Sequence, residues 1–98
     1  MDITKKLDGD HLTIALDGRL DTATAPELTK VLKESLNDVK VLTFDMAKLD
    51  YISSAGLRAI LAAKKDLHNK GTVDIINAND IVKEVFSVTG FDNIFDIA

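Results

Sequence analysis

Two adjacent serines, Ser53 and Ser54, have the side chains whose chemistry most needs an explanation. They lie in the segment LDYISSAGLRAIL, from Leu49 to Leu61, between a strand-like run and a helix-like run. A serine at the start of a helix can cap that helix, act as a nucleophile, or present its hydroxyl to a modifying enzyme. These three possibilities imply three different functions.

The residues around the serines argue against an enzyme. The segment lacks the G-x-S-x-G pattern of a nucleophile elbow. Two histidines could serve as a base, but His11 belongs to an early strand and His68 lies about 20 Å further along the same predicted helix. There is no cysteine, metal-ligating residues do not cluster, and SSAG holds too little glycine for a phosphate-binding loop. We therefore expect no catalysis, no metal site and no cofactor.

The composition limits the classes of partner and compartment. A chain of 98 residues, 46% hydrophobic and 29% charged, can build one modest core, so we expect a single domain over residues 1–98. The net charge of −4, with both signs interspersed, provides no basic surface for nucleic acid. The sequence shows no apolar leader region, and no apolar run approaches the ~18 residues of a membrane span. We expect a cytoplasmic protein that does not insert into a membrane.

The first half of the chain predicts a hairpin, a helix and a strand. The alternating segments ITKKL and HLTIALDG, joined by the turn residues DGD, are typical of an antiparallel hairpin. The segment 18–38 has apolar residues at helical spacing, with a capping-box start at Thr24, Pro26 and Glu27. The nearly continuous apolar run Val39–Met46 predicts a central strand that is covered on both faces.

The second half continues the alternation of helices and strands. A helix follows the serines and stops at Gly71, TVDIINA predicts a buried strand, and NDIVKEVFSVTG predicts a capped helix ending at Gly90. The last residues, FDNIFDIA, have room for a short strand or an apolar anchor. We therefore predict an α/β fold, in which a small mixed β-sheet has helices packed against it and an N-terminal β-hairpin precedes alternating helices and strands.

Two segments together resemble a known family. LDYISSAGLRAIL is similar to the signature of STAS domains, the fold of bacterial anti-sigma factor antagonists. LDGRLDTATAPEL, from Leu16 to Leu28, is similar to the loop that leads from their second strand into their first helix. The likeness continues in the same order through VDIINANDIVKEVFSVTGFDNIF. The resemblance covers nearly the whole chain and implies the same α/β fold.

The resemblance also implies a modification site. In well-known antagonists the signature reads as an aspartate, the phosphoacceptor serine, a serine or threonine, and then Gly-Leu. Placing Gly56 and Leu57 on that Gly-Leu pair puts Ser54 on the phosphoacceptor, Ser53 on the aspartate and Ala55 on the hydroxyl residue. The family likeness therefore implies phosphorylation at Ser54, and Ser53 is the alternative acceptor.

The function implied by the resemblance is partner switching. In such systems the unmodified antagonist binds an anti-sigma factor that is also a serine kinase, phosphorylation releases it, and a serine phosphatase restores binding. The partner-binding residues expected around the serines are Asp21, Thr22, Ser53, Ser54, Ala55 and Arg58. STAS domains also serve as subunits or scaffolds of transport and signalling complexes, and this alternative remains open at the level of sequence.

Overall fold

The N-terminal hairpin forms where the alternation of the sequence predicts it. The computed structural model describes residues 1–97. In chain order the elements are β1 (Asp2–Asp8), β2 (His11–Leu20), α1 (Ala25–Ser35), β3 (Val41–Ile52), α2 (Ser54–Asp66), β4 (Thr72–Ile76), α3 (Asp80–Val88), a 3₁₀ turn η1 (Phe91–Asn93) and β5 (Asp96–Ile97). β1 and β2 pair antiparallel. Leu12, Ile14 and Leu16 point from β2 into the core and are at most 3% exposed.

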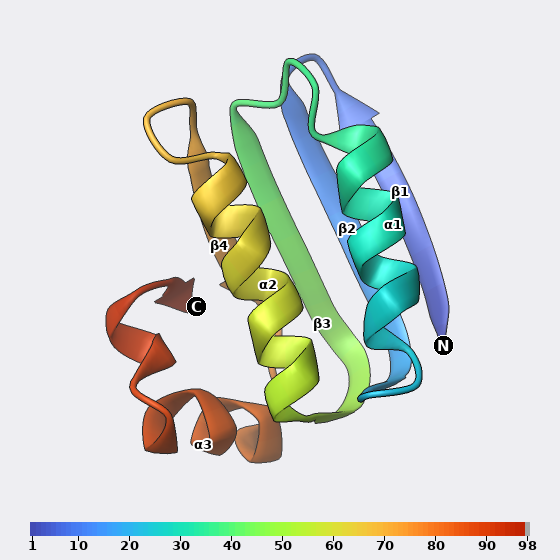
Figure 1. Cartoon of the computed structure of the whole chain (residues 1–98). Coiled ribbons are helices and arrows are strands. Elements are labelled where there is room, and N and C mark those ends of the chain that lie inside the picture. The colour runs from blue at the N-terminus through green and yellow to red at the C-terminus, as the bar shows by residue number, and fades with distance from the viewer. Residues whose placement is uncertain (98) are drawn as a thin grey trace.

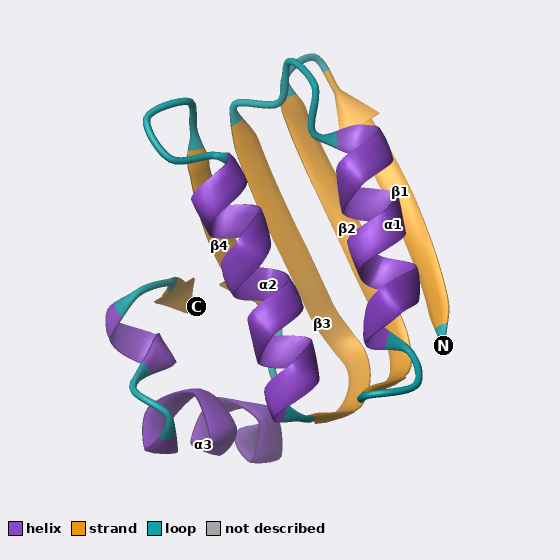
Figure 2. Ribbon diagram, viewed as in Figure 1, coloured by secondary structure: helices purple, strands orange, loops and turns teal. Residues whose placement is uncertain are grey.

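The five strands form one mixed sheet in the order β1-β2-β3-β4-β5. Only the β1–β2 pair is antiparallel, and the pairs from β2 to β5 are parallel. Figure 1 shows α1 and α2 side by side across one face of the sheet, and Figure 2 shows this helical layer in front of the strands. The predicted α/β fold, with an N-terminal hairpin and then alternating helices and strands, is confirmed.

The central strand is longer than the sequence predicts. We expected Val39–Met46, whereas β3 runs from Val41 to Ile52 and takes in half of the segment before the serines. Its second half pairs with the end of β2, and two register shifts interrupt this ladder. Such bulges break the two-residue alternation, so the buried residues Leu49 and Ile52 are three positions apart. This spacing hid the strand from a search for regular periodicity.

The central strand, which we predicted to be covered on both faces, has two faces of different chemistry. Leu42, Phe44 and Met46 face the helical layer and are fully buried, but Thr43 points to the opposite face. There its hydroxyl donates to the Asp74 carboxylate (2.6 Å) and lies 2.8 Å from His11 Nε2. Because the hydroxyl has one proton, it accepts its second hydrogen bond from the imidazole. Thr43 is only 5% exposed, and these two hydrogen bonds satisfy its buried hydroxyl.

The start of α1 is where we predicted it, but the capping box does not form. Thr24 is the N-cap residue, yet it has a helical backbone conformation and makes no side-chain cap bond. Its hydroxyl instead donates to the Arg19 carbonyl (2.7 Å) and accepts from the Asp21 N–H (2.9 Å). The Thr24 side chain, which the sequence predicted to cap α1, therefore holds the loop between β2 and α1 together.

The C-terminal elements follow the predicted caps. The Asn79 side chain accepts from the Val82 N–H (2.8 Å) at the start of α3 and donates to the Leu49 carbonyl of β3 (3.0 Å). Gly90 ends the helix region with a φ of 77°, in the left-handed conformation that favours glycine. The tail forms a short strand, as expected, with Ala98 outside the described residues.

Helix α2 begins in very close contact with the end of β2. A Cβ atom added to Gly56 would lie 2.7 Å from Leu20 Cγ and 2.9 Å from the Leu20 carbonyl oxygen. Real Cβ atoms do not approach a backbone oxygen so closely. Glycine at this position therefore sets the distance between the first turn of α2 and the sheet.

We expect Gly56→Ala to destabilise the protein, although alanine is favoured over glycine in a helix by ~1 kcal/mol. Overpacking against Leu20 costs ~1 to 3 kcal/mol, and the backbone oxygen cannot turn aside. The melting temperature should fall, at a rate of about 4 to 8 °C per kcal/mol. Ala62→Gly, at an exposed position of the same helix, measures the propensity effect alone. A higher melting temperature for Gly56→Ala would contradict the close packing.

Candidate functional site

Two loops meet at the edge of the sheet where the parallel strands β2 and β3 end. The Ser53 N–H donates to the Leu20 carbonyl (2.9 Å), which extends the β2–β3 ladder by one bond beyond the end of β3. This hydrogen bond holds the loop that begins at Asp21 beside the first turn of α2. Functional groups of parallel α/β sheets gather at this edge because the connecting loops converge there.

Ser53 is the N-cap of α2. Its Oγ accepts from the Gly56 N–H (3.4 Å), and its carbonyl accepts from the Leu57 N–H (2.9 Å). Its backbone is extended, as is usual for an N-cap residue. The position that the family signature assigns to an aspartate is therefore a capping position, and serine and aspartate cap about equally well.

Ser54 is the first residue of α2, and its side chain is exposed. Among the hydrogen bonds of residues 1–97, none involves its hydroxyl. It lies at the helix end where free backbone N–H groups and the positive end of the dipole favour negative charge. Of the two serines, Ser53 therefore caps the helix, and Ser54 presents an accessible hydroxyl.

Asp21 organises the loop between β2 and α1. Its carboxylate accepts from the backbone N–H groups of Thr24 (3.2 Å) and Ala23 (3.0 Å), and Arg19 Nε lies 3.7 Å away. These groups, the Thr24 N–H above all, hold the pKa of Asp21 below its ordinary value of 3.8, and partial desolvation opposes them. The Asp21 side chain is 31% exposed, so it binds the loop amides and is still accessible to solvent.

Arg19 and Tyr51 form a pair that the sequence analysis missed. Their strands pair at these two residues, and the Arg19 guanidinium carbon lies 4.5 Å from the centre of the Tyr51 ring. The ring and Asp21 together orient an arginine that is 61% exposed. Arginine and tyrosine are enriched in the energetically dominant part of protein interfaces. The sequence feature that could have indicated this pair is that Arg19 and Tyr51 each lie close to the end of a strand.

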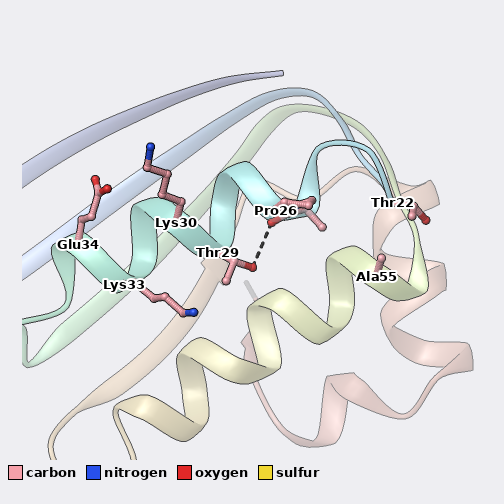
Figure 3. A pocket seen from close by; sticks show the side chains of 8 residues that line it. Thr22, Pro26, Thr29, Lys30, Lys33, Glu34 and Ala55 are labelled. Carbon is pink, nitrogen blue, oxygen red and sulfur yellow. Dashed lines mark hydrogen bonds between the residues drawn. The ribbon is translucent and has the colours of Figure 1, made fainter.

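A groove runs beside the serines between α1 and α2. Its volume is about 640 Å³. Figure 3 shows Thr22 and Ala55 at one end, near the start of α2, and Lys30 and Lys33 further along α1. The residues lining the groove are Thr22, Ala25, Pro26, Thr29, Lys30, Lys33, Glu34 and Ala55. Arg58 is exposed one helical turn beyond Ser54. The structure therefore brings the six predicted partner-binding residues to one end of the molecule.

The two histidines are placed away from the serines. His11 is bonded to Thr43 on the opposite face of the sheet, and His68 follows the far end of α2. Within residues 1–97 no three histidine, aspartate or glutamate side chains are grouped so that they could hold a metal ion. Over the same range, none of the helices has the length and apolar character needed to span a bilayer.

Comparison with known proteins identifies the family. The sequence model described as STAS domain matches residues 2–98. This chain belongs to the STAS domain family. The STAS resemblance predicted from the two sequence motifs is therefore confirmed.

Two sequence relatives of this STAS domain are named as anti-sigma factor antagonists. BtrV of Bordetella bronchiseptica, named as an anti-sigma factor antagonist, is 36% identical over 95% of this chain and 81% of its own length. The anti-sigma-B factor antagonist of Listeria monocytogenes is 28% identical over 95% and 83%. The solved structure of SpoIIAA in its unphosphorylated form matches with a TM-score of 0.85 and 19% identity, covering 99% of this chain and 88% of that one. This last match is one of fold.

Substitutions at the two serines should separate the cap from the free hydroxyl in this STAS domain. We expect Ser53→Ala to lower the free energy of unfolding by ~0.5 to 2 kcal/mol, whereas Ser53→Asp keeps the cap. Ser54→Ala should change it by less than ~0.5 kcal/mol. Ser54→Asp should leave it unchanged or raise it by ~0.3 to 1 kcal/mol through the helix dipole. Thermal unfolding of the four variants tests this, and a larger loss for Ser54→Ala than for Ser53→Ala would contradict the assignment.

The loop of Asp21 should loosen in acid. The pKa of Asp21 is lower in the folded state than its ordinary 3.8, so its contribution is complete above that ordinary value and is lost as the pH falls through the folded pKa. We expect an NMR titration to give a carboxyl pKa below 3.8, with faster exchange of the Ala23 and Thr24 amides at the acid end. Asp21→Asn should remove the pH dependence of that exchange. A titration at or above the ordinary value would refute the proposed bonds.

Proposed function

We propose that this STAS domain is an anti-sigma factor antagonist that acts by partner switching through Ser54. The observation that carries the proposal is the exposed, unbonded hydroxyl of Ser54 at the start of α2, beside a cap already made by Ser53. The names of BtrV and of the Listeria relative support the choice of partner. In this proposal the domain is a regulator, and the catalysis belongs to its partners.

The partner in this scheme is an anti-sigma factor with serine kinase activity. The kinase transfers the γ-phosphoryl group of ATP to Ser54 Oγ, and ADP and the hydroxyl proton leave. A serine phosphatase returns the hydroxyl by hydrolysis with water. The unmodified form binds the anti-sigma factor, and the phosphorylated form is released from it.

The docking surface surrounds the acceptor serine. We assign to it the six residues expected from the family likeness, which are Asp21, Thr22, Ser53, Ser54, Ala55 and Arg58, and add Arg19 and Tyr51. The guanidinium of Arg19 is held against the Tyr51 ring before any partner arrives, which lowers the entropy cost of using it. The groove between α1 and α2 continues this surface away from the serines.

Charge explains how one phosphate can switch binding without unfolding the domain. A phosphoserine adds ~1.5 to 2 negative charges at neutral pH. At the first residue of α2 this charge is favourable for its own helix, because it meets free N–H groups and the dipole. Inside an interface the same charge loses its water without gaining a partner. The cost therefore falls on binding and leaves the core unchanged.

Incubation with the cognate kinase and ATP should place phosphate on Ser54, as resolved by mass spectrometry. Calorimetry should show that Ser54→Asp lowers the affinity for the anti-sigma factor by between ~30-fold and several thousandfold, because an unpaired buried charge costs ~2 to 5 kcal/mol. Ser54→Ala should keep binding and lose phosphorylation. Ser87→Asp, at an exposed serine on α3, is the matched control and should bind as the wild type does.

Three outcomes would contradict the proposal in different ways. Phosphate found chiefly on Ser53 would mean that the register is off by one. Normal binding by Ser54→Asp would remove Ser54 from the interface. An unmodified protein that neither binds nor is phosphorylated by the kinase would favour the alternative of a subunit or scaffold in a transport or signalling complex.

A further inference from the structure

Exposed apolar side chains gather in the last quarter of the chain. Ile81, Val88 and Ile94 are 62%, 80% and 41% exposed, respectively. Exposed apolar side chains scattered singly are ordinary, but a contiguous group bordered by charge often marks an interaction surface. These three side chains belong to two such groups, one on α3 and one between α2 and η1.

The first group is a stripe along the outer side of α3. Val82 and Phe86 of this helix are fully buried in the core, and the stripe lies outside that contact. A shallow groove of about 300 Å³ follows it. The acidic stripe, as we name it, consists of Ile81, Glu84, Val85 and Val88, at the i, i+3, i+4, i+7 spacing of one helix face. Lys83, the basic residue of α3, points away from this face.

The second group is a stripe along the C-terminal half of α2 and the turn that follows it. It lies beside η1, and a groove of about 310 Å³ follows it. The basic stripe, as we name it, consists of Leu61, Lys64, Lys65 and His68, with Ile94 alongside. Lys64 is partly fixed, since its Nζ lies 5.7 Å from the centre of the Phe95 ring. Lys65 and His68 are exposed.

The two stripes match in length and spacing and are opposite in charge. The acidic stripe lies within α3, whereas the basic stripe runs from Leu61 along the last residues of α2 to His68 in the turn beyond Asp66. Both follow the i, i+3, i+4, i+7 spacing of one helix face. Glu84 lies near the middle of the acidic stripe, and Lys64 and Lys65 lie near the middle of the basic stripe. Apolar side chains flank the charges on both. A helix pair formed from the two stripes would cover Ile81, Val88 and Ile94 and bring Glu84 to the lysines.

We propose that the acidic stripe on α3 of one copy packs against the basic stripe on α2 of a second copy, and that two such contacts form a symmetric dimer. Each chain carries one acidic and one basic stripe, so two copies related by a two-fold axis pair both. In a two-fold dimer every contact occurs twice, because residue i meets j and j meets i. Figure 1 shows α3 and the C-terminal segment together on the side of α2 away from α1.

The dimer leaves the switch surface free. The basic stripe begins at Leu61, about 10 Å along α2 from Ser54 at ~1.5 Å per residue. The groove beside the serines lies on the α1 side of α2, opposite the C-terminal segment. The dimer is thus independent of the proposed function, and either can fail alone. An interface built from so few side chains is of the weak class, with charges that salt screens.

Sedimentation velocity of the purified chain tests the association. At low salt we expect a rise from monomer toward dimer as the concentration approaches about 1 mM, and a loss of dimer at 1 M salt, where the screening length is ~3 Å. A monomer throughout would overturn the proposal and leave the stripes to a different protein. Growth beyond the dimer would overturn the two-fold arrangement.

Charge reversal identifies the surface. Glu84→Lys and Lys65→Glu should each raise the dimer dissociation constant at least about tenfold, because like charges then meet in both contacts. An equimolar mixture of the two variants should dimerise again, since each acidic or basic stripe then finds its opposite. Lys83→Glu is the matched control on α3, and it should dimerise as the wild type does. A dimer that tolerates both reversals, or a mixture that stays monomeric, would overturn the pairing of the stripes.

Discussion

The site depends on the contact between the end of β2 and the first turn of α2. One hydrogen bond, from the Ser53 N–H to the Leu20 carbonyl, continues the ladder beyond the end of β3, and Gly56 lets the helix approach Leu20 without a clash. Together they set where α2 begins and therefore which serine caps it. They also bring the Asp21 loop beside that helix end. A shift of one residue here would exchange the roles of Ser53 and Ser54.

The separation of the cap, Ser53, from the proposed acceptor, Ser54, follows from this contact. A cap hydroxyl is engaged with the backbone, so changing it alters the helix as well as the surface. The Ser54 hydroxyl, at the first position of α2, does not cap the helix. Negative charge at this position is favoured by the helix dipole. A phosphate there can alter binding while the fold is kept. In the proposed switch, a small domain of limited stability would therefore keep its core unchanged.

The two faces of the sheet differ in the side chains that they carry. One face is buried under α1 and α2 and supplies the core. The other carries a polar chain in which His11, Thr43 and Asp74 link the three strands β2, β3 and β4. The histidine that could have suggested catalysis therefore has a structural partner far from the serines.

The sequence by itself determined the local elements, because periodicity, turn residues and caps act over a few neighbours. It gave the hairpin, the helices, the order of the fold and a serine pair at a strand–helix junction. The tertiary structure decided what depends on pairing between distant segments. The bulged β2–β3 ladder lengthened β3 to Ile52 and brought Arg19 onto Tyr51, and the Leu20 carbonyl selected Ser53 as the cap. These outcomes rest on contacts between residues far apart in the chain, which no local pattern encodes.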